Sequence, residues 1–314
     1  MKTKTYLMGL MLAVVSALVM PADVAAYDFA SDNIYYDVIG PSQVAVVLND
    51  EMIPSYQGHI VIPDVVEHEG VNYTVTTISD GAFFKSIDLH SVTLPSTITE
   101  LFWEAFVESS SRLIVPDLET WCSINFHIDS SYGQGDPDFR VWPHELVMDQ
   151  SIENLVIPSS VTEIHDYTFY NTATIRSVVI PDQVTTIGSG AFAVCENLKS
   201  VKIGPNVTYI GYRAFDTNFD LWYSDTYGVI DEVTCMATVP PELYNSYGST
   251  VFNKGTFKKG VLYVPAQSIG AYRADAEWGK FENIQPIPAV QGDVNGDGVL
   301  SVADVSALID LLLN

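Results

Sequence analysis

Hydrophobic and polar positions recur in a unit of about 23 residues through the middle of the chain, as in RSVVIPDQVTTIGSGAFAVCENLK. Val178 and Ile180 alternate with an outward residue, which is the periodicity of a β-strand. Pro181 ends that strand because proline cannot donate to a ladder. In the segment VTTIG, Val184 and Ile187 face inward with two threonines between them. The rest of the unit predicts a short helical or irregular arc that carries Phe192 inward. Each unit is therefore expected to form one coil with a single apolar side.

Two sequence markers keep the same period along the chain. The first is a phenylalanine, evenly spaced except for one longer gap after the second, at Phe83, Phe106, Phe169, Phe192 and Phe215. The second is an apolar residue followed by proline, at Ile62-Pro63, Leu94-Pro95, Val115-Pro116, Ile157-Pro158 and Ile180-Pro181. Units of this length cannot bury their apolar sides alone, and stacking them creates a continuous core. We therefore predict a repeat solenoid, mainly β with short helical arcs, of about six coils.

Stacking also predicts ladders of equivalent residues about 4.8 Å apart. The expected inward ladder is Val92, Leu113, Leu155, Val178 and Val201. The expected outward ladder is Thr76, Thr99, Thr162, Thr185 and Thr208. A solenoid of such short coils is not expected to contain a deep cleft.

The repeat resembles the BspA-like leucine-rich repeats of proteins from host-associated anaerobic bacteria. The stretch VVIPDQVTTIGSGAFAVCENLKSVKIGPNVTYIGYRAF carries the resemblance, which extends over roughly residues 54–287. YQGHIVIPDVVEHEGVNYTVTTISDGAF is similar to the family's entry repeat, and LYVPAQSIGAYRADAEWGKFENIQPI to its closing segment. The resemblance implies binding or adhesion at a cell surface, with varied ligands.

The N-terminus and the charge of the chain limit its function. Residues 1–26 have two lysines, an apolar run and small residues in the order of a secretory signal peptide, with a retained anchor as the alternative. We therefore expect an exported chain, secreted or at the cell surface, that does not span the membrane after the signal is removed. A net charge of −25 argues against nucleic-acid binding and against anionic membrane surfaces.

Two insertions interrupt the repeat, near residues 117–150 and 216–230. Because insertions in repeat proteins form loops on one face, these are candidate ligand-binding segments. Their aromatic residues offer large rigid contact areas for a protein or a glycan: Tyr132, Phe139, Trp142, Phe219, Trp222, Tyr223 and Tyr227. Alternatively, these rings fold back as lids over exposed coil edges, and we weigh that structural interpretation ahead of a contact surface.

Catalytic motifs are not found in the sequence, so we expect no enzyme. There is no GxSxG, no HExxH and no glycine-rich phosphate loop. The three cysteines, Cys122, Cys195 and Cys235, lack metal-type spacing, and either one disulfide or isolated buried thiols would fit them. The six histidines show no metal spacing either.

The C-terminal tail contains the spacing of a calcium-binding loop, GDVNGDGVLSVAD. Its expected ligands are Asp293, Asn295, Asp297, the carbonyl of Val299, Ser301 through water, and Asp304 in place of the usual glutamate. Six to eight oxygen ligands around one point are what Ca²⁺ requires, and Gly298 would allow the sharp turn. Asp-rich turns without a metal are the alternative.

An apolar helix is expected directly after this loop. Its partner-docking residues are Val302, Ala303, Val305, Leu308, Ile309 and Leu312. A helix this short needs packing to be stable in water, against the solenoid end, a second half-module or a receptor. Loop plus exiting helix resembles a dockerin, which implies calcium-dependent docking onto cohesin domains. A dockerin normally carries two such segments, and this chain carries one.

The predicted organisation is a signal peptide followed by three further parts. Residues 1–26 are the signal peptide, 27–61 an N-terminal cap, 62–287 the solenoid with a closing segment at 257–287, and 288–314 a half-dockerin. The first hypothesis is a non-catalytic binding or adhesion protein whose solenoid contacts a protein or glycan ligand. The alternative is a non-catalytic component of a polysaccharide-degrading complex, recruited through a cohesin-like partner of the tail.

Overall fold

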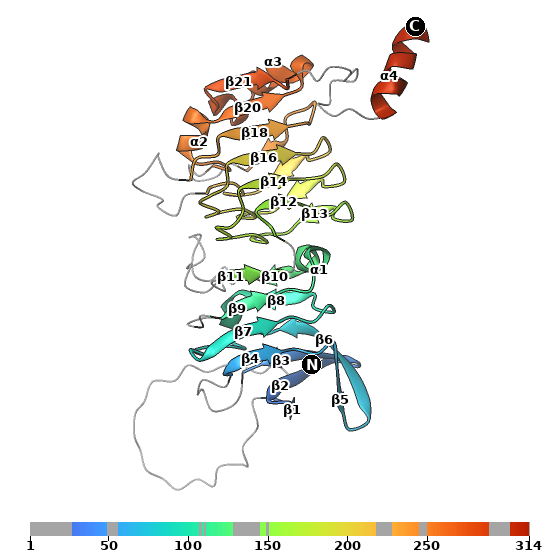
Figure 1. Ribbon diagram of the computed structural model, residues 1–314, viewed down its shortest axis with the longest axis vertical. Coiled ribbons are helices and arrows are strands. Elements are labelled where there is room, and N and C mark those ends of the chain that lie inside the picture. Colours follow the sequence, from blue (N-terminus) through green and yellow to red (C-terminus); the bar gives the residue numbers. More distant parts are fainter. Residues whose placement is uncertain are drawn as a thin grey trace.

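The computed structural model describes residues 27–48, 56–106, 109, 111–127, 145–148, 151–217, 228–244, 250–288 and 302–313. Short strands are stacked along one long axis, with the N-terminal elements at one end and the closing segment at the other (Figure 1). The predicted repeat solenoid is confirmed. It consists mostly of strands with a few short helices, as the alternation and the prolines of the repeat require.

Four sheets make up the described part of the solenoid. Sheet A contains β1 (Phe29–Ser31), β2 (Ile34–Gly40), β3 (Gln43–Val47), β6 (Val71–Ile78), β8 (Glu100–Phe102) and β10 (Asn125–His127), with β5 (Val65–His68) on β6. Sheet B contains β4 (Gly58–Val61), β7 (Leu89–Thr93), β9 (Arg112–Ile114) and β11 (Glu145–Val147). Sheet C contains β12 (Asn154–Val156), β14 (Ser177–Val179), β16 (Ser200–Ile203), β18 (Glu232–Cys235), β20 (Val261–Val264) and β21 (Asn283–Pro286). Sheet D contains β13 (Glu163–Ile164), β15 (Thr186–Ile187), β17 (Tyr209–Ile210) and β19 (Glu242–Leu243).

The helices are short and lie between strands or at the ends. The α-helices are α1 (Leu118–Ser123), α2 (Lys254–Lys259), α3 (Ile269–Ala274) and α4 (Val302–Leu313). The 3₁₀ helices are η1 (Trp103–Phe106), η4 (Ala266–Ser268) and η5 (Trp278–Lys280). None of the helices described here combines the length and the apolar character needed to cross a membrane.

The repeated phenylalanines form the centre of the core. Phe83 and Phe106 stack with ring centroids 5.0 Å apart. In the C-terminal half, Phe169, Phe192 and Phe215 stack at 5.3 Å per step. Phe252, outside the predicted set, continues that stack at 5.4 Å from Phe215. All are essentially inaccessible to solvent. The period of the repeat thus determines which ring lies over which.

The predicted inward ladder is partly wrong. Val92 pairs with Leu113, and Leu155, Val178 and Val201 follow one another in register, but Leu113 and Leu155 are not neighbours. Leu146 of β11 occupies the place beside Leu113 instead. Sheet B ends at β11 and a new sheet begins at β12, because the predicted insertion near 117–150 contains α1, β10 and β11 rather than loop alone.

A buried tryptophan connects the two parts of the stack across this break. The indole Nε1 of Trp121, in α1, donates to the carbonyl of Thr168 at 2.8 Å. Trp121 is 1% exposed and packs edge-on against Phe126 at 5.0 Å. The apolar core therefore continues from the N-terminal coils into the C-terminal ones, even though the strand ladders do not.

The outward threonines join successive coils. The backbone N–H and the hydroxyl of Thr99 both donate to the carbonyl of Thr76, at 2.9 and 3.3 Å. Thr185 bonds Thr162 and Thr208 bonds Thr185 in the same way. The predicted threonine ladder is thus present in two segments, and Thr76, 7% exposed, is its one buried member.

The far end of the solenoid is closed by an aromatic cluster. Tyr272, Trp278 and Phe281 are buried, and the indole Nε1 of Trp278 donates to the carbonyl of Pro241 at 2.8 Å. The hydroxyl of Tyr272 donates to the carbonyl of Ala237 at 2.8 Å. These polar contacts let large rings cover the last coil without leaving buried donors unsatisfied.

Candidate functional site

Most of the predicted site residues lie outside the described residues. This holds for the loop residues Asp293, Asn295, Asp297, Val299 and Ser301, and for the aromatic set Tyr132, Phe139, Trp142, Phe219, Trp222, Tyr223 and Tyr227. Asp304 and Ala303 fall within α4, but their side chains are not described. Among the described side chains, no group of three or more His, Cys, Asp or Glu is placed to hold a metal ion.

The expected docking helix is present as α4. Its ribbon extends clear of the solenoid (Figure 1), and its described apolar side chains are exposed to solvent. The exposed fractions are 81% for Val302, 55% for Val305, 46% for Leu308, 49% for Ile309 and 76% for Leu312. Of the three surfaces suggested for this helix, the end of the solenoid does not cover it.

The described residues form a cavity on the outer face of sheet B. Its volume is about 520 Å³ and it is half open to solvent. Polar groups come from His59, Asp88, His90, Ser91 and Arg112. Ile87, Leu89 and Ile114 supply the apolar lining. Pockets of about 300–1,000 Å³ with an apolar lining and a few convergent polar groups are typical of small-ligand sites.

Three neighbouring strands place these groups in one row. His59 of β4 is in register with Ser91 of β7, and Ser91 is in register with Arg112 of β9. The His59 imidazole Nδ1 and the Ser91 hydroxyl form a hydrogen bond of 2.8 Å. Since Ser91 is small and 4% exposed, the longer side chains of the row stand around it and leave space above it.

A bulge adds a second outward residue on β7. Gly58 pairs with Leu89, but the next residue, His59, pairs with Ser91, so His90 is an additional residue in the ladder. The His90 ring consequently lies on the outer face, 5.5 Å from the His59 ring. Bulges turn side chains in this way and occur often beside binding sites.

The same outward pair recurs in other coils with different chemistry. Two consecutive outward residues separate the buried pairs Leu89 and Val92, Ile175 and Val178, Leu198 and Val201, and Ile230 and Val233. On sheet C, Arg176 of such a pair forms an ion pair with Glu153 at 2.8 Å, and Ser177 bonds Asn154 at 2.8 Å. Long paired side chains cover that face, whereas imidazoles and a small serine leave the cavity open on sheet B.

The turn before β7 completes the cavity. The carbonyl of Asp88 accepts from the backbone N–H of Gly58 at 2.8 Å, which holds Asp88 against β4. Ile87 is 65% exposed at the rim, whereas the Leu89 side chain is buried in the core. The cavity thus combines apolar surface from Ile87 and Ile114 with one carboxylate, one hydroxyl, two imidazoles and a guanidinium.

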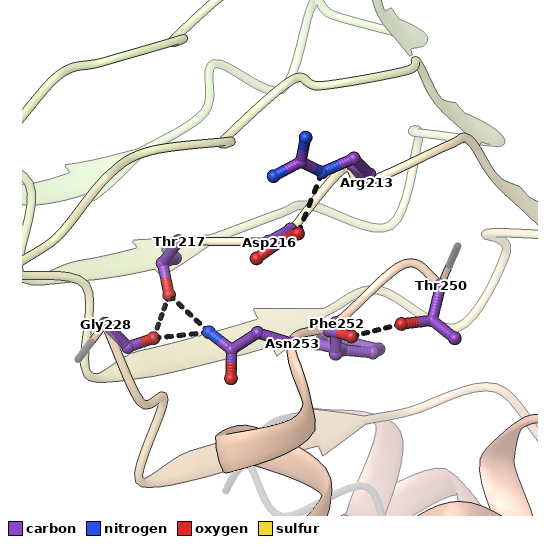
Figure 2. A network of polar contacts seen from close by, with 7 residues as sticks. All are labelled: Arg213, Asp216, Thr217, Gly228, Thr250, Phe252 and Asn253. Carbon is purple, nitrogen blue, oxygen red and sulfur yellow. Dashed lines mark hydrogen bonds and ion pairs between the residues drawn. The ribbon is translucent and has the colours of Figure 1, made fainter. Parts of the chain in front are cut away.

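A second polar network clamps the chain on both sides of the aromatic insertion at 218–227 (Figure 2). The Thr217 hydroxyl donates to the carbonyl of Gly228. The Asn253 amide donates to the same carbonyl at 2.8 Å, and its oxygen caps α2 by accepting from Thr256 N–H at 2.8 Å. The two ends of the predicted contact segment are therefore fixed to the N-terminus of α2.

A buried ion pair adjoins this network. The Arg213 guanidinium Nε lies 2.8 Å from Asp216 Oδ2, and the side chains are 5% and 16% exposed (Figure 2). Buried pairs of this kind fix local geometry because either partner alone would be costly in the interior. We assign this pair to the structure of the coil rather than to ligand binding.

The three cysteines are free and buried. Burial raises the pKa of the Cys122 and Cys195 thiols to about 12 and that of Cys235 to about 11. Thiols are nucleophilic and bind metals as thiolates, which such values disfavour at neutral pH. Of the two sequence interpretations, isolated thiols hold and a disulfide does not.

Sequence reasoning missed the two histidines of the cavity and expected no cleft. His59 and His90 are far apart in the sequence because the hairpin of β5 and β6 lengthens this coil. The interval from Ile62-Pro63 to Leu94-Pro95 is longer than that from Leu94-Pro95 to Val115-Pro116 for the same reason. Counting three residues back from Ile62 and three back from Leu94, the apolar residues of these two markers, would have aligned His59 with Ser91. The signal was present but hidden by the longer coil.

Comparison with known proteins supports the repeat assignment. The model of the BspA type leucine rich repeat region matches residues 67–120 and 147–226, in six copies. These stretches are thus similar to leucine-rich repeats of the BspA type. None of the curated proteins compared with the chain matches it.

Solved structures of repeat proteins are also similar to the chain. A leucine-rich repeat protein from Bacteroides ovatus is 15% identical over 76% of this chain and 71% of that one, with a TM-score of 0.35. A leucine rich cell surface protein from Faecalibacterium prausnitzii is 15% identical, covering 86% and 97%, with a TM-score of 0.31. The leucine-rich repeat protein of T. pallidum is 15% identical, covering 80% and 92%, with a TM-score of 0.33.

Proposed function

We propose that this leucine-rich repeat protein is an exported, non-catalytic binding or adhesion protein whose solenoid contacts a protein or glycan ligand. The observation that carries the proposal is the half-open cavity on sheet B, where polar groups from three strands and one turn converge beside the apolar residues Ile87 and Ile114. The signal-peptide pattern of residues 1–26 supports the export part of the proposal. The acidic net charge favours a ligand other than nucleic acid.

The chemistry of the cavity favours binding over catalysis. Asp88 is the one carboxylate among the described residues that line it, whereas glycoside cleavage uses a pair of carboxyl groups on either side of the scissile bond. The buried thiols, whose pKa values are raised to about 11–12, are poor nucleophiles.

An array of matrix proteins, mucins and polysaccharides tests this proposal. We expect the solenoid without residues 1–26 to bind at least one of them reproducibly and saturably. Thermally unfolded protein is the control, because binding through the folded face must be lost on unfolding. Absence of binding across a broad array of all three classes would overturn the proposal.

A second candidate function is recruitment into a polysaccharide-degrading complex through the tail. The specific observation in its favour is α4, whose apolar residues Val305, Leu308, Ile309 and Leu312 are about half exposed or more. A helix of this kind gains most of its stability from packing, so an outside partner would stabilise it. We propose that Asp293, Asn295, Asp297, Val299, Ser301 and Asp304 bind Ca²⁺ and order the tail for a cohesin-like partner.

Calorimetric titration of calcium tests the metal site. The wild-type protein is expected to give a one-site isotherm, with a dissociation constant of about 1 mM or lower, as in extracellular calcium modules. Asp297→Ala removes a charged ligand and should abolish the heat. Asp310→Ala, which changes an aspartate of α4 outside the ligand spacing, is the matched control and should leave the isotherm unchanged. Equal heats from wild type and Asp297→Ala would exclude the loop.

A pull-down with the wild-type chain tests the docking role. Capture of a cohesin-bearing protein in calcium, and its release by chelator, would favour recruitment into a complex. The docking variant Leu308→Asp places a charge on the exposed stripe and should reduce capture without changing calcium binding. Capture that is identical with and without chelator would count against the second candidate.

A further inference from the structure

We propose that the cavity on sheet B binds an acidic sugar unit, a pyranose ring that carries a carboxylate, at the end or side of a glycan chain. This inference rests on the proposed binding function of the solenoid and specifies the ligand of one site. Hexuronates and sialic acids share this chemistry. The cavity is defined by His59, Ile87, Asp88, Leu89, His90, Ser91, Arg112 and Ile114.

The size and opening of the cavity suit one or two sugar rings. A volume of about 520 Å³ lies in the range of about 300–1,000 Å³ found for small-ligand pockets. The opening lets the rest of a glycan chain extend into solvent. A protein ligand that binds through a flat surface, in contrast, would not need a hollow between neighbouring strands.

The lining has the two kinds of surface that a pyranose ring requires. Ile114 and, at the rim, Ile87 give apolar surface on which the C–H face of the ring can lie. The Asp88 carboxylate can accept hydrogen bonds from ring hydroxyls, and the Ser91 hydroxyl can donate or accept. Ser91 is held by its bond of 2.8 Å to His59, so this group is oriented before a ligand arrives.

The local charge favours an acidic ring over a neutral one. Arg112 is the permanent cation of the cavity, and the imidazoles of His59 and His90 add hydrogen-bonding groups, beside the single carboxylate of Asp88. The whole chain is acidic, with 14 basic against 39 acidic residues. An anion is therefore disfavoured over most of the surface and is better accommodated where the Arg112 guanidinium lies beside these hydrogen-bonding groups.

Arg112 is the group that we assign to the sugar carboxylate. A guanidinium binds a carboxylate through two parallel N–H donors. Arg112 already has a contact within the protein. Because a guanidinium carries five N–H donors, it can serve such a partner and a ligand together.

Titration with defined saccharides tests the assignment. Glucuronic-acid oligosaccharides and sialyllactose represent the two sources of the carboxylate, and lactose is the neutral control. We expect at least one acidic saccharide to bind at least tenfold more tightly than lactose. We also expect this preference to shrink at high salt, because an ion pair at a half-open site is screened.

Two variants and one control locate the binding. Arg112→Gln should lower the affinity for the acidic saccharide at least tenfold and leave lactose binding unchanged. His90→Ala should weaken binding through the bulge residue. Arg176→Gln makes the same chemical change on the same face of sheet C, outside the cavity, and should have no effect. Thermal unfolding of each variant verifies that the fold is retained.

The outcomes separate this inference from the proposed function. If the chain binds ligands on the array but Arg112→Gln and His90→Ala bind all of them as wild type does, the acidic-sugar site is wrong and the binding function stands. Equal affinity for lactose and the acidic saccharides would also overturn it. If neither array nor saccharides show any binding, both proposals fail together.

Discussion

Gly228 has a backbone conformation that other residues can adopt only with strain. Its φ is +60°, in the left-handed region, and a Cβ would lie 2.4 Å from the carbonyl oxygen of Thr217. We expect Gly228→Ala to lower the free energy of unfolding by about 2 kcal/mol or more, because left-handed backbone alone costs an L-residue about 1–2 kcal/mol. Urea unfolding monitored by circular dichroism measures the change.

Gly270 provides the matched control for this substitution. It is exposed in α3, and a Cβ added there would meet nothing within 4 Å. Gly270→Ala should therefore be neutral or stabilising by up to about 1 kcal/mol, since alanine is favoured in helices. Equal effects of the two substitutions would show that the clamp between Thr217 and Gly228 does not determine the conformation of this coil.

At the scale of the element, the tail helix and the closing segment should differ in how much they contribute to the stability of the solenoid. We expect deletion of residues 289–314 to change the melting temperature of the solenoid by no more than about 2 °C. This corresponds to a change in the free energy of unfolding of less than about 1 kcal/mol. The reason is that the apolar residues of α4 are 46% to 81% exposed and bury little surface on the solenoid. Differential scanning calorimetry of the two chains measures this.

A substitution in the closing segment should behave in the opposite way. Trp278 is inaccessible to solvent and donates to the carbonyl of Pro241, so Trp278→Ala is expected to cost about 3–5 kcal/mol. A large loss of stability on deleting the tail would contradict the structure, because it would mean that α4 packs against the last coil.

Elements with a strict period could be predicted from the sequence, and the interrupted ones could not. Phe83, Phe106, Phe169, Phe192 and Phe215 are buried as predicted, because one register fixes the inward side of every coil. The strands β10 and β11 were missed, since the glycines, proline and aromatic residues between them indicate a loop. The predicted calcium loop and aromatic residues stay predictions, whereas the cavity depends on the register of His59 with Ser91, which the longer coil between them hides in the sequence.

At the scale of the whole molecule, one apolar core passes through two sets of sheets. The strand ladders stop between β11 and β12, yet the buried cluster continues from the N-terminal cap to the closing segment. Because the core is shared, buried groups in both parts should unfold in a single transition. The three thiols are distributed over this core, with Cys122 in α1 and Cys195 and Cys235 in the C-terminal part.

Alkaline pH is therefore expected to destabilise the whole solenoid. In the folded protein the thiol pKa values are raised to about 11–12, whereas an unfolded cysteine ionises near pH 8.5. Above about pH 8.5 the folded state binds more protons than the unfolded state, so the free energy of unfolding falls as pH rises, by up to about 1.4 kcal/mol per pH unit for each thiol. This stability is complete below pH 8.5 and is lost towards the folded pKa values. Urea midpoints at pH 8, 9 and 10 measure the slope, and a variant with alanine at all three cysteines should show a shallower one. Identical slopes in the two proteins would mean that the thiols do not remain protonated in the folded core.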